Sequence, residues 1–374
     1  MLTNKAMGLI FANMHSSSVG NMTAQRTMAS LPFAGRYRLV DFCLSSFVRG
    51  GLREVGVIVK ENYHSLMNHL GSGKEWDLSR KIAGLMVYPP FIGSLSGTVY
   101  HGKIAALYNV LPYIKESGSK HVVLADCDHV SNFNTAELVN NHIDNGADVT
   151  ILCYEQQNKD EGGLNATSVL RDENGRVIDI DFNRPPKENY LVSMNIMVIN
   201  RELLIELVED AYSHRMIVLE RDILQHHIKD LFINTVVYDG FVRRINSVQS
   251  YFTSSMSLLE PDNRKCLFDP LKPIYTKVND DAPARYGIGC NVKNSLVADG
   301  CIIEGEIENC LLFRGAKVRS GSVLKNCIIM QDTVIEEGAS LSYVIADKEV
   351  KIGKDRSLMG YESYPLYIQK GSVV

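Results

Sequence analysis

Residues 12–42 read ANMHSSSVGNMTAQRTMASLPFAGRYRLVDF and follow a short apolar run at residues 7–11 that predicts a buried strand. A strand that ends in such a loop has the frame of a phosphate-binding loop. Glycines usually let that loop take positive φ and approach a nucleotide, but Asn13, Met14 and Ser18 stand here. Side chains in left-handed backbone carry strain, and neither Ser nor Met neutralises phosphate charge as Arg or Lys does. The loop therefore has the position of a phosphate site without its chemistry.

Strand-like and helical segments alternate between residues 7 and 237. The predicted strands cover residues 55–60, 122–125, 149–154 and 191–199, and the predicted helices cover residues 41–49, 135–145 and 201–212. Asn174-Gly175 predicts a hairpin of residues 167–171 and 177–182. This alternation predicts an α/β, Rossmann-like domain with a mostly parallel sheet over residues 1–247. Ligands of such sheets bind beyond the carboxyl ends of the strands, where residues 12–18 would lie.

The pattern changes after residue 247. A helix is predicted at residues 248–259, and the connector up to residue 283 is punctuated by Pro261, Pro270, Pro273 and Pro283. From there the chain repeats itself: similar four-residue runs begin at Asn294, Asn309, Asn326 and Ser342. Aliphatic residues recur every 16 positions at Ile302, Val318, Val334 and Val350. We therefore expect a left-handed parallel β-helix over residues 284–374, since a β-sandwich would alternate without that period.

The composition is that of an ordinary globular protein, with 45% hydrophobic and 22% charged residues in 374. A net charge of −4 gives no reason to expect nucleic acid or acidic membranes as partners. No apolar run approaches the ~18 residues that span a bilayer, and the N-terminus has no signal-peptide layout, which favours the cytoplasm. The eight cysteines form no C-x-x-C pair, so we expect buried, reduced thiols and no zinc.

Residues 31–42, LPFAGRYRLVDF, together with Thr23 and Arg26, resemble the N-terminal segment of bacterial glucose-1-phosphate adenylyltransferases (ADP-glucose pyrophosphorylases). The order of the two domains extends the resemblance across nearly the whole chain. Within the family, the chain is similar to the non-catalytic GlgD-type subunit of glycogen biosynthesis. The resemblance implies that the first domain is a sugar-nucleotide pyrophosphorylase-like nucleotidyltransferase domain.

Several positions depart from the pattern of the active enzymes. Their G-G-x-G-x-R loop is replaced at Asn13, Met14 and Ser18, and a Lys two positions after Arg26 is Met28 here. The acid of a W-R-D-V-G-T-like segment, which binds magnesium in active relatives, aligns with Arg244. Magnesium needs carboxylate oxygens and would be repelled by Arg. The resemblance thus implies a degenerate site with no catalytic residues and no metal, and we expect Arg244 to lie beside Asp128.

Other family positions are retained, and the resemblance marks them as vestigial ligand-binding residues. Asp128 belongs to the counterpart of a G-D-H motif, Gly102 to that of G-T-A-D-A, and Arg184 to that of E-K-P. Ser193 begins the counterpart of S-M-G-I-Y, Asp222 matches the acid of a D-F-G-K-D-L-like segment, and Arg26 is the Arg noted above. These residues could equally serve only to maintain the fold.

Two further basic residues are candidates for effector binding. Arg36 occupies the position of a family Lys that contributes to sugar-phosphate effector binding, and Arg53 matches a nearby Arg. The alternative for each is an ordinary surface salt bridge.

The resemblance implies a regulatory subunit, non-catalytic or weakly catalytic, that supports ADP-glucose synthesis for glycogen. Its expected partner is a catalytic glucose-1-phosphate adenylyltransferase subunit that supplies the magnesium, in a heterotetramer. Self-association and a sugar-phosphate or nucleotide effector are compatible with this function. Two other interpretations stay open: an active nucleotidyltransferase with an unorthodox loop that recruits His15, Arg26 and Lys103, and a pure scaffold without a ligand.

Overall fold

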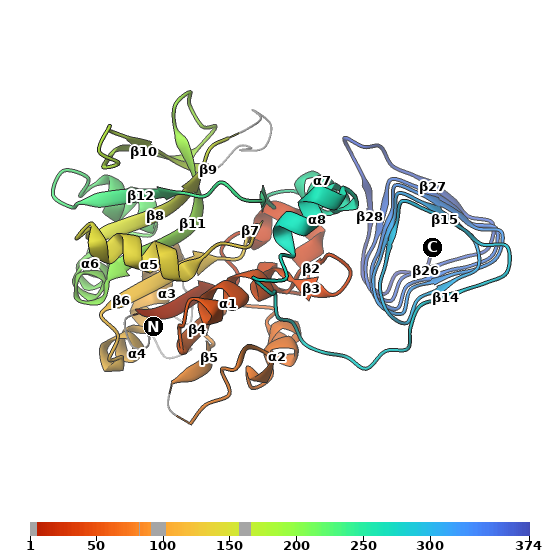
Figure 1. The fold of residues 1–374 in the computed structure, drawn as a ribbon, viewed down its shortest axis with the longest axis horizontal. Helices are drawn as coiled ribbons and strands as arrows, with labels where there is room; N and C mark the ends of the chain where they lie inside the picture. Colours follow the sequence, from red (N-terminus) through yellow and green to blue (C-terminus); the bar gives the residue numbers. More distant parts are fainter. Residues whose placement is uncertain (1–5, 82, 91–101, 157–165) are drawn as a thin grey trace.

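The computed structural model describes residues 6–81, 83–90, 102–156 and 166–374. An α/β domain forms one end of the molecule and a triangular β-helix the other (Figure 1). Both predicted fold classes are therefore confirmed. Among the described residues, no helix has the length and apolar character that a membrane crossing requires.

A nine-stranded sheet forms the centre of the first domain. Strand β1 (Ala6–Phe11) lies between β4 (Glu54–Ile58) and β6 (His121–Asp126) and is parallel to both, and β5 (Gly84–Tyr88) extends the parallel part. Strand β11 (Leu191–Asn200) runs antiparallel to β6 and to β8 (Val149–Tyr154), and β12 (Ile233–Val237) is parallel to β8. The predicted hairpin is β9 (Ala166–Arg171) and β10 (Val177–Arg184).

Helices cover both faces of this sheet (Figure 1). They are α1 (Leu39–Arg49), α2 (His64–Leu70), α3 (Gly102–Asn109), α4 (Leu111–Glu116), α5 (Thr135–Asp144) and α6 (Arg201–Ser213). Neighbouring residues of β1 belong to different cores, because Leu9 packs in one apolar cluster and Ile10 in the other. A strand that is buried on both sides reads as a continuous apolar run, which is why residues 7–11 could be recognised.

Three five-stranded parallel sheets form the walls of the β-helix. The first contains β14 (Arg285–Tyr286), β17 (Ile302–Ile303), β20 (Lys317–Val318), β23 (Val334–Ile335) and β26 (Lys351–Ile352). The second contains β15 (Asn291–Lys293), β18 (Glu306–Glu308), β21 (Val323–Lys325), β24 (Ser340–Ser342) and β27 (Ser357–Met359). The third contains β16 (Leu296–Val297), β19 (Leu311–Leu312), β22 (Ile328–Ile329), β25 (Val344–Ala346) and β28 (Leu366–Ile368).

The register of the coils differs from the strict 16-residue period. Val318 pairs with Ile303 and Ile335, so residues 16 positions apart are not paired in this wall. Adjacent coils of the first wall are offset by 17, 15, 17 and 17 residues, which is close to the predicted period of 16. Asn294, Asn309 and Asn326 take positive φ at one corner, and Tyr343 rather than Ser342 holds this corner in the next coil. Asn tolerates that conformation better than most residues, which explains the recurring Asn.

The two domains share one apolar core. Leu311, Phe313 and Met330 of the β-helix belong to the same buried cluster as Phe33 and Tyr251 of the first part of the chain. The linking segment begins with α7 (Val248–Met256), a short 3₁₀ turn at Ser257–Leu259 and α8 (Pro261–Leu267). It lies beside the β-helix at the junction (Figure 1). The predicted helix at residues 248–259 is thus present, with its last turn tightened.

All eight cysteines are free thiols. Six are buried, as expected, but Cys266 is exposed and Cys290 is partly exposed. The expectation that every thiol is buried is therefore wrong for these two.

Candidate functional site

A cavity of about 310 Å³ lies at the carboxyl ends of the central strands, where the sequence places the degenerate loop. The loop after β1 forms one wall, the start of α3 forms another, and residues within β9, β10 and β11 line the rest together with residues of the segments 217–220 and 244–246. The lining residues are Met14, His15, Ser17, Ser18, Gly102, Lys103, Thr167, Phe182, Asn183, Asn195, Ile217, Val218, Glu220, Arg244 and Asn246.

The loop itself has a conformation that suits residues other than glycine. None of residues 13–18 takes positive φ, and a 3₁₀ helix begins at Ser16. The Asn13 amide is tied to the end of β4, accepting a hydrogen bond from Lys60 N and donating one to Glu61 O, each at 3.0 Å. Met14 faces the cavity. Because none of these residues has a left-handed backbone, the loop does not require glycine at any of them.

Arg244 lies beside Asp128, as the sequence comparison predicted. Arg244 Nε donates a hydrogen bond to Asp128 Oδ2 over 3.2 Å, and both side chains are buried. Asn195 Nδ2 donates to the same oxygen over 2.9 Å. A register shift in β11 between Ser193 and Ile196 places Asn195 at positive φ, and such bulges often re-aim a side chain. The other oxygen, Oδ1, lies 2.8 Å from His129 Nδ1.

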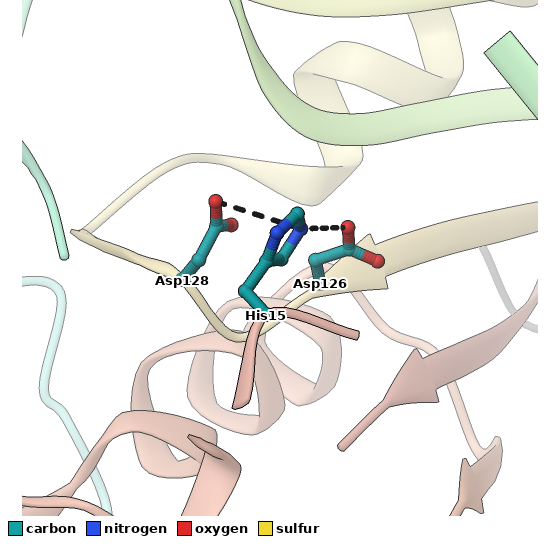
Figure 2. Close-up of side chains that lie close together, drawn as sticks. All are labelled: His15, Asp126 and Asp128. Carbon is teal, nitrogen blue, oxygen red and sulfur yellow. Dashed lines mark hydrogen bonds and ion pairs between the residues drawn. The ribbon is translucent and has the colours of Figure 1, made fainter. Parts of the chain in front are cut away.

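A second buried acid, Asp126, ends β6 and organises the rest of the cluster. Its Oδ2 lies 2.8 Å from His15 Nε2 and 2.9 Å from Lys103 Nζ. Lys103 also contacts Glu220 Oε1 at 2.5 Å. His15 Nε2 lies 3.7 Å from Asp128 Oδ2, so this imidazole bridges the two aspartates (Figure 2). The site is therefore a continuous network of alternating charges.

The network shifts the titration of its members. Burial of His15 opposes its protonation, but Asp128 and Asp126 outweigh burial and raise the pKa of the imidazole. Burial favours the neutral form of Asp128, but His129, His15 and Arg244 hold its pKa well below the usual value. Burial likewise opposes the charge of Lys103, yet Asp126 and Glu220 raise its pKa. These shifts favour the charged form of each group.

His15, Asp126 and Asp128 could in principle hold a metal, because one ligand atom from each lies within 4.8 Å of the others. The sequence analysis did not anticipate this group. Magnesium does not fit it well, since Asp128 Oδ2 already accepts from Arg244 and Asn195, and Asp126 Oδ2 contacts Lys103. A protonated His15 would also repel the ion. Side chains of the protein thus contact three of the four carboxylate oxygens, and Asp126 Oδ1 is the one without a hydrogen-bond partner among the described residues.

Among the retained family positions, only Gly102 lines the cavity and only Asp128 lies directly behind it. Gly102 takes positive φ, and a Cβ there would lie 2.2 Å from the carbonyl oxygen of Ile217. A side chain at this position would close one wall of the cavity, so the glycine is required by packing.

The structure places the other four retained residues elsewhere. Arg26 binds both carboxylate oxygens of Asp347 in the β-helix, at 2.7 and 2.8 Å. Asp222 accepts hydrogen bonds from Ile217 N and Val218 N, and it pairs with Arg221, which together lower its pKa to about 2. The Ser193 hydroxyl accepts from Asn195 N. Arg184 does not line the cavity; its side chain is 71% exposed and lies 3.8 Å from Asp181. Each of these contacts serves the fold.

Met28, one of the degenerate positions, is 1% exposed and packs in the core that joins the domains. A Lys could not occupy this apolar site without a partner. Asp126, Glu220 and Asn195 also belong to the site, although the sequence patterns did not predict them. The one available signal was Asp126, an acid two positions before Asp128 at the end of a strand.

A second pocket, of about 190 Å³, lies between the two domains and is rich in cations. Its basic side chains are Arg36, Arg38, His69, Lys277, Arg314 and Lys348. Burial and neighbouring cations lower the pKa of Lys348 to about 7, and burial lowers that of Arg38 to about 10. Arg314 is 6% exposed, and its Nη2 has no hydrogen-bond partner among the described residues. Positive charge is thus concentrated here without full compensation.

The two effector candidates are separated by the structure. Arg36 lines the interdomain pocket and lies 3.7 Å from Asp299. Arg53 does not line it and instead pairs with the exposed Asp77 at 2.9 Å. Arg53 therefore has the surface salt bridge that was its alternative interpretation.

Comparison with known proteins agrees with this architecture. Residues 17–233 match the nucleotidyl transferase family, and residues 277–363 match the GlmU-like, C-terminal hexapeptide family. The glycogen biosynthesis protein GlgD of Bacillus subtilis is 36% identical over 378 residues, which cover 100% of this chain and 98% of the relative. GlgD of Geobacillus stearothermophilus is 37% identical, with 86% and 84% covered. The glucose-1-phosphate adenylyltransferase of Thermotoga maritima is 31% identical, with 85% and 76% covered.

Proposed function

The chain belongs to the nucleotidyl transferase family, with GlgD proteins and glucose-1-phosphate adenylyltransferases among its relatives, and we propose that it acts in glycogen biosynthesis as a regulatory subunit. In this proposal a catalytic glucose-1-phosphate adenylyltransferase makes ADP-glucose, and the present chain tunes it within a heterotetramer. A cytoplasmic location is part of the proposal, and eight free thiols support a reducing compartment.

One observation carries the non-catalytic role: a guanidinium is bound to the carboxylate that would have to hold magnesium. Both oxygens of Asp128 have partners in the protein, with Arg244 and Asn195 on Oδ2 and His129 beside Oδ1. Displacing Arg244 would strand a buried cation, which is costly. Nucleotidyl transfer needs positive charge that is directed at the phosphates, whereas these cations are directed at acids of the protein.

Other described residues at positions that contact phosphate in active relatives are engaged within the protein or buried in its core. Ser18 donates its hydroxyl to the carbonyl of His15, and Met28 is buried in the core. Arg26, which the alternative active enzyme would recruit, is held by Asp347 instead. These contacts support the regulatory function over the active one.

The interdomain pocket supports a regulatory role that depends on binding an anionic effector. Burial lowers the pKa of Lys348 and of Arg314, and neighbouring cations lower both further because like charges repel one another. A bound anion would relieve this repulsion. We include in the proposal that a sugar phosphate or nucleotide binds there, with Arg36 and Arg314 as ligands. The pocket joins both domains, so an occupant would change how they pack.

Reconstitution with the catalytic subunit of the same organism tests the proposal. ADP-glucose formation is measured for each chain alone and for the mixture, and size-exclusion chromatography with light scattering gives the assembly. We expect a heterotetramer whose activity or effector response differs from that of the catalytic chain alone. A chain truncated before Ala284 is the control and should fail to assemble. Co-elution without any kinetic change would favour the scaffold, and absence of co-elution would refute the proposal.

A further inference from the structure

The charged groups of the site cavity compensate one another. Among the described residues, the carboxylates of Asp126, Asp128 and Glu220 contact the basic side chains of His15, Lys103 and Arg244, and His129 also contacts Asp128. Each of these basic side chains, as far as the structure describes its contacts, thus already lies against an acid of the protein.

An anionic ligand would have to break this balance. Lys103 Nζ lies between Asp126 and Glu220, at 2.9 and 2.5 Å, so a phosphate that recruited it would leave two buried carboxylates uncompensated. Arg244 serves Asp128 in the same way. Buried charges that lose their partners destabilise a protein strongly, so the cavity disfavours phosphorylated ligands.

The remaining lining suits a neutral ligand. Hydroxyl and amide groups are offered by Ser17, Thr167, Asn183 and Asn246, and Phe182 with Ile217 and Val218 supplies apolar surface. Hydroxyls and amides both donate and accept hydrogen bonds without requiring charge. Binding pockets typically combine such apolar surface with a few polar groups, and their volumes are about 300–1,000 Å³. At about 310 Å³ this cavity is suited to a small ligand.

From these features we infer that the site cavity binds an uncharged, hydroxyl-rich molecule of about monosaccharide size, and not a nucleotide or sugar phosphate. The aromatic ring of Phe182 would pack on the C–H face of the sugar ring, and the amides would bind its hydroxyls. This inference goes beyond the proposed function and does not require the partner subunit. Its failure would leave the reconstitution result unaffected.

Titration calorimetry and saturation-transfer NMR on the full chain can test it with glucose and glucose 1-phosphate as probes. Phe182→Ala removes the stacking surface, and Ile178→Ala, an exposed residue of the same strand, is the matched control. Glucose 1-phosphate could also bind in the pocket between the domains. Binding to the site cavity is therefore measured as the difference in affinity between the unaltered chain and Phe182→Ala.

We expect glucose to bind in the millimolar range, with about a tenfold loss in Phe182→Ala and none in Ile178→Ala. The Phe182-dependent part of the affinity should be no greater for glucose 1-phosphate than for glucose. The inference is overturned if glucose shows no Phe182-dependent binding at millimolar concentration, or if the phosphate strengthens that binding. Glucose binding by the unaltered chain is measured without any variant, so its absence overturns the inference even if Phe182→Ala does not fold.

Discussion

Arg244 donates a hydrogen bond from Nε to Asp128 Oδ2 over 3.2 Å, and the two side chains come from positions 116 residues apart in the chain. The pair places a permanent cation on a carboxylate at the carboxyl end of the central sheet. Arg cannot be deprotonated in a protein, so this compensation does not vary with pH. The Arg244 side chain thus takes the place beside Asp128 that a bound metal ion would otherwise have.

Replacing Arg244 with Asp should create a weak divalent site. Two carboxylates would then face one another in the cavity, and hard cations prefer such oxygens. Calorimetry should detect magnesium binding to Arg244→Asp and none to the unaltered chain or to the neighbouring control Arg243→Asp. Catalysis should not return, since Met28 and Ser18 remain. Magnesium binding by the unaltered chain that Asp128→Asn abolishes would contradict this prediction.

Arg26→Ala should destabilise the junction of the two domains. Arg26 and Asp347 form a buried, two-oxygen ion pair, and removing one member of such a pair costs about 3–5 kcal/mol. Urea denaturation should show a loss of that size in the free energy of unfolding. Lys354→Ala breaks an exposed pair with Glu337 and should leave stability nearly unchanged. Similar denaturation curves for the two variants would exclude a structural role for the Arg26 pair.

The stability contributed by His15 should decrease with rising pH. Its pKa is raised in the folded state, so the contribution is complete below the unfolded value of about 6.5 and disappears as pH rises through the folded pKa. The difference in unfolding free energy between the unaltered chain and His15→Gln should therefore be largest in mild acid. An NMR titration of the His15 ring gives the pKa directly. A value below the ordinary one would refute the charge-balanced network.

Arg36→Ala should weaken the response of the assembled enzyme to a phosphorylated effector. Loss of one charge-assisted contact should raise the half-activating concentration about five- to tenfold and leave the basal rate unchanged. Arg53→Ala is the matched control, because Arg53 pairs with Asp77 away from the pocket. If both variants keep the activation curve of the unaltered complex, the pocket is not an effector site.

The sequence predicted the fold because its signals are local. Runs such as residues 7–11 are apolar throughout, and Asn recurs at positive-φ corners of the β-helix. The register did not follow from a period of 16 because the first wall is offset by 15 residues once and by 17 three times, and because Tyr343 takes the corner of the fourth coil without resembling Asn. A local pattern identifies a repeat, but strand pairing fixes its phase.

The site was predictable only where one partner was already known. Arg244 could be matched with Asp128 because both align with acids of a metal pair. Arg26 gave no indication that its partner is Asp347, 321 positions away in another domain. The contacts of Lys103 with Asp126 and Glu220 likewise depend on how three separate elements meet. Tertiary packing, and not local sequence, decides such long-range charge pairs.

Turnover by the isolated chain tests the central claim most directly. The purified chain, free of any catalytic subunit, is supplied with saturating ATP, glucose 1-phosphate and magnesium, and ADP-glucose is measured. We predict no turnover above background, because the cations of the cavity are bound to its own acids and single losses of charge-stabilising groups already cost about 10²–10³ in rate. Turnover of about 1–10³ s⁻¹, typical of enzymes, would contradict the account.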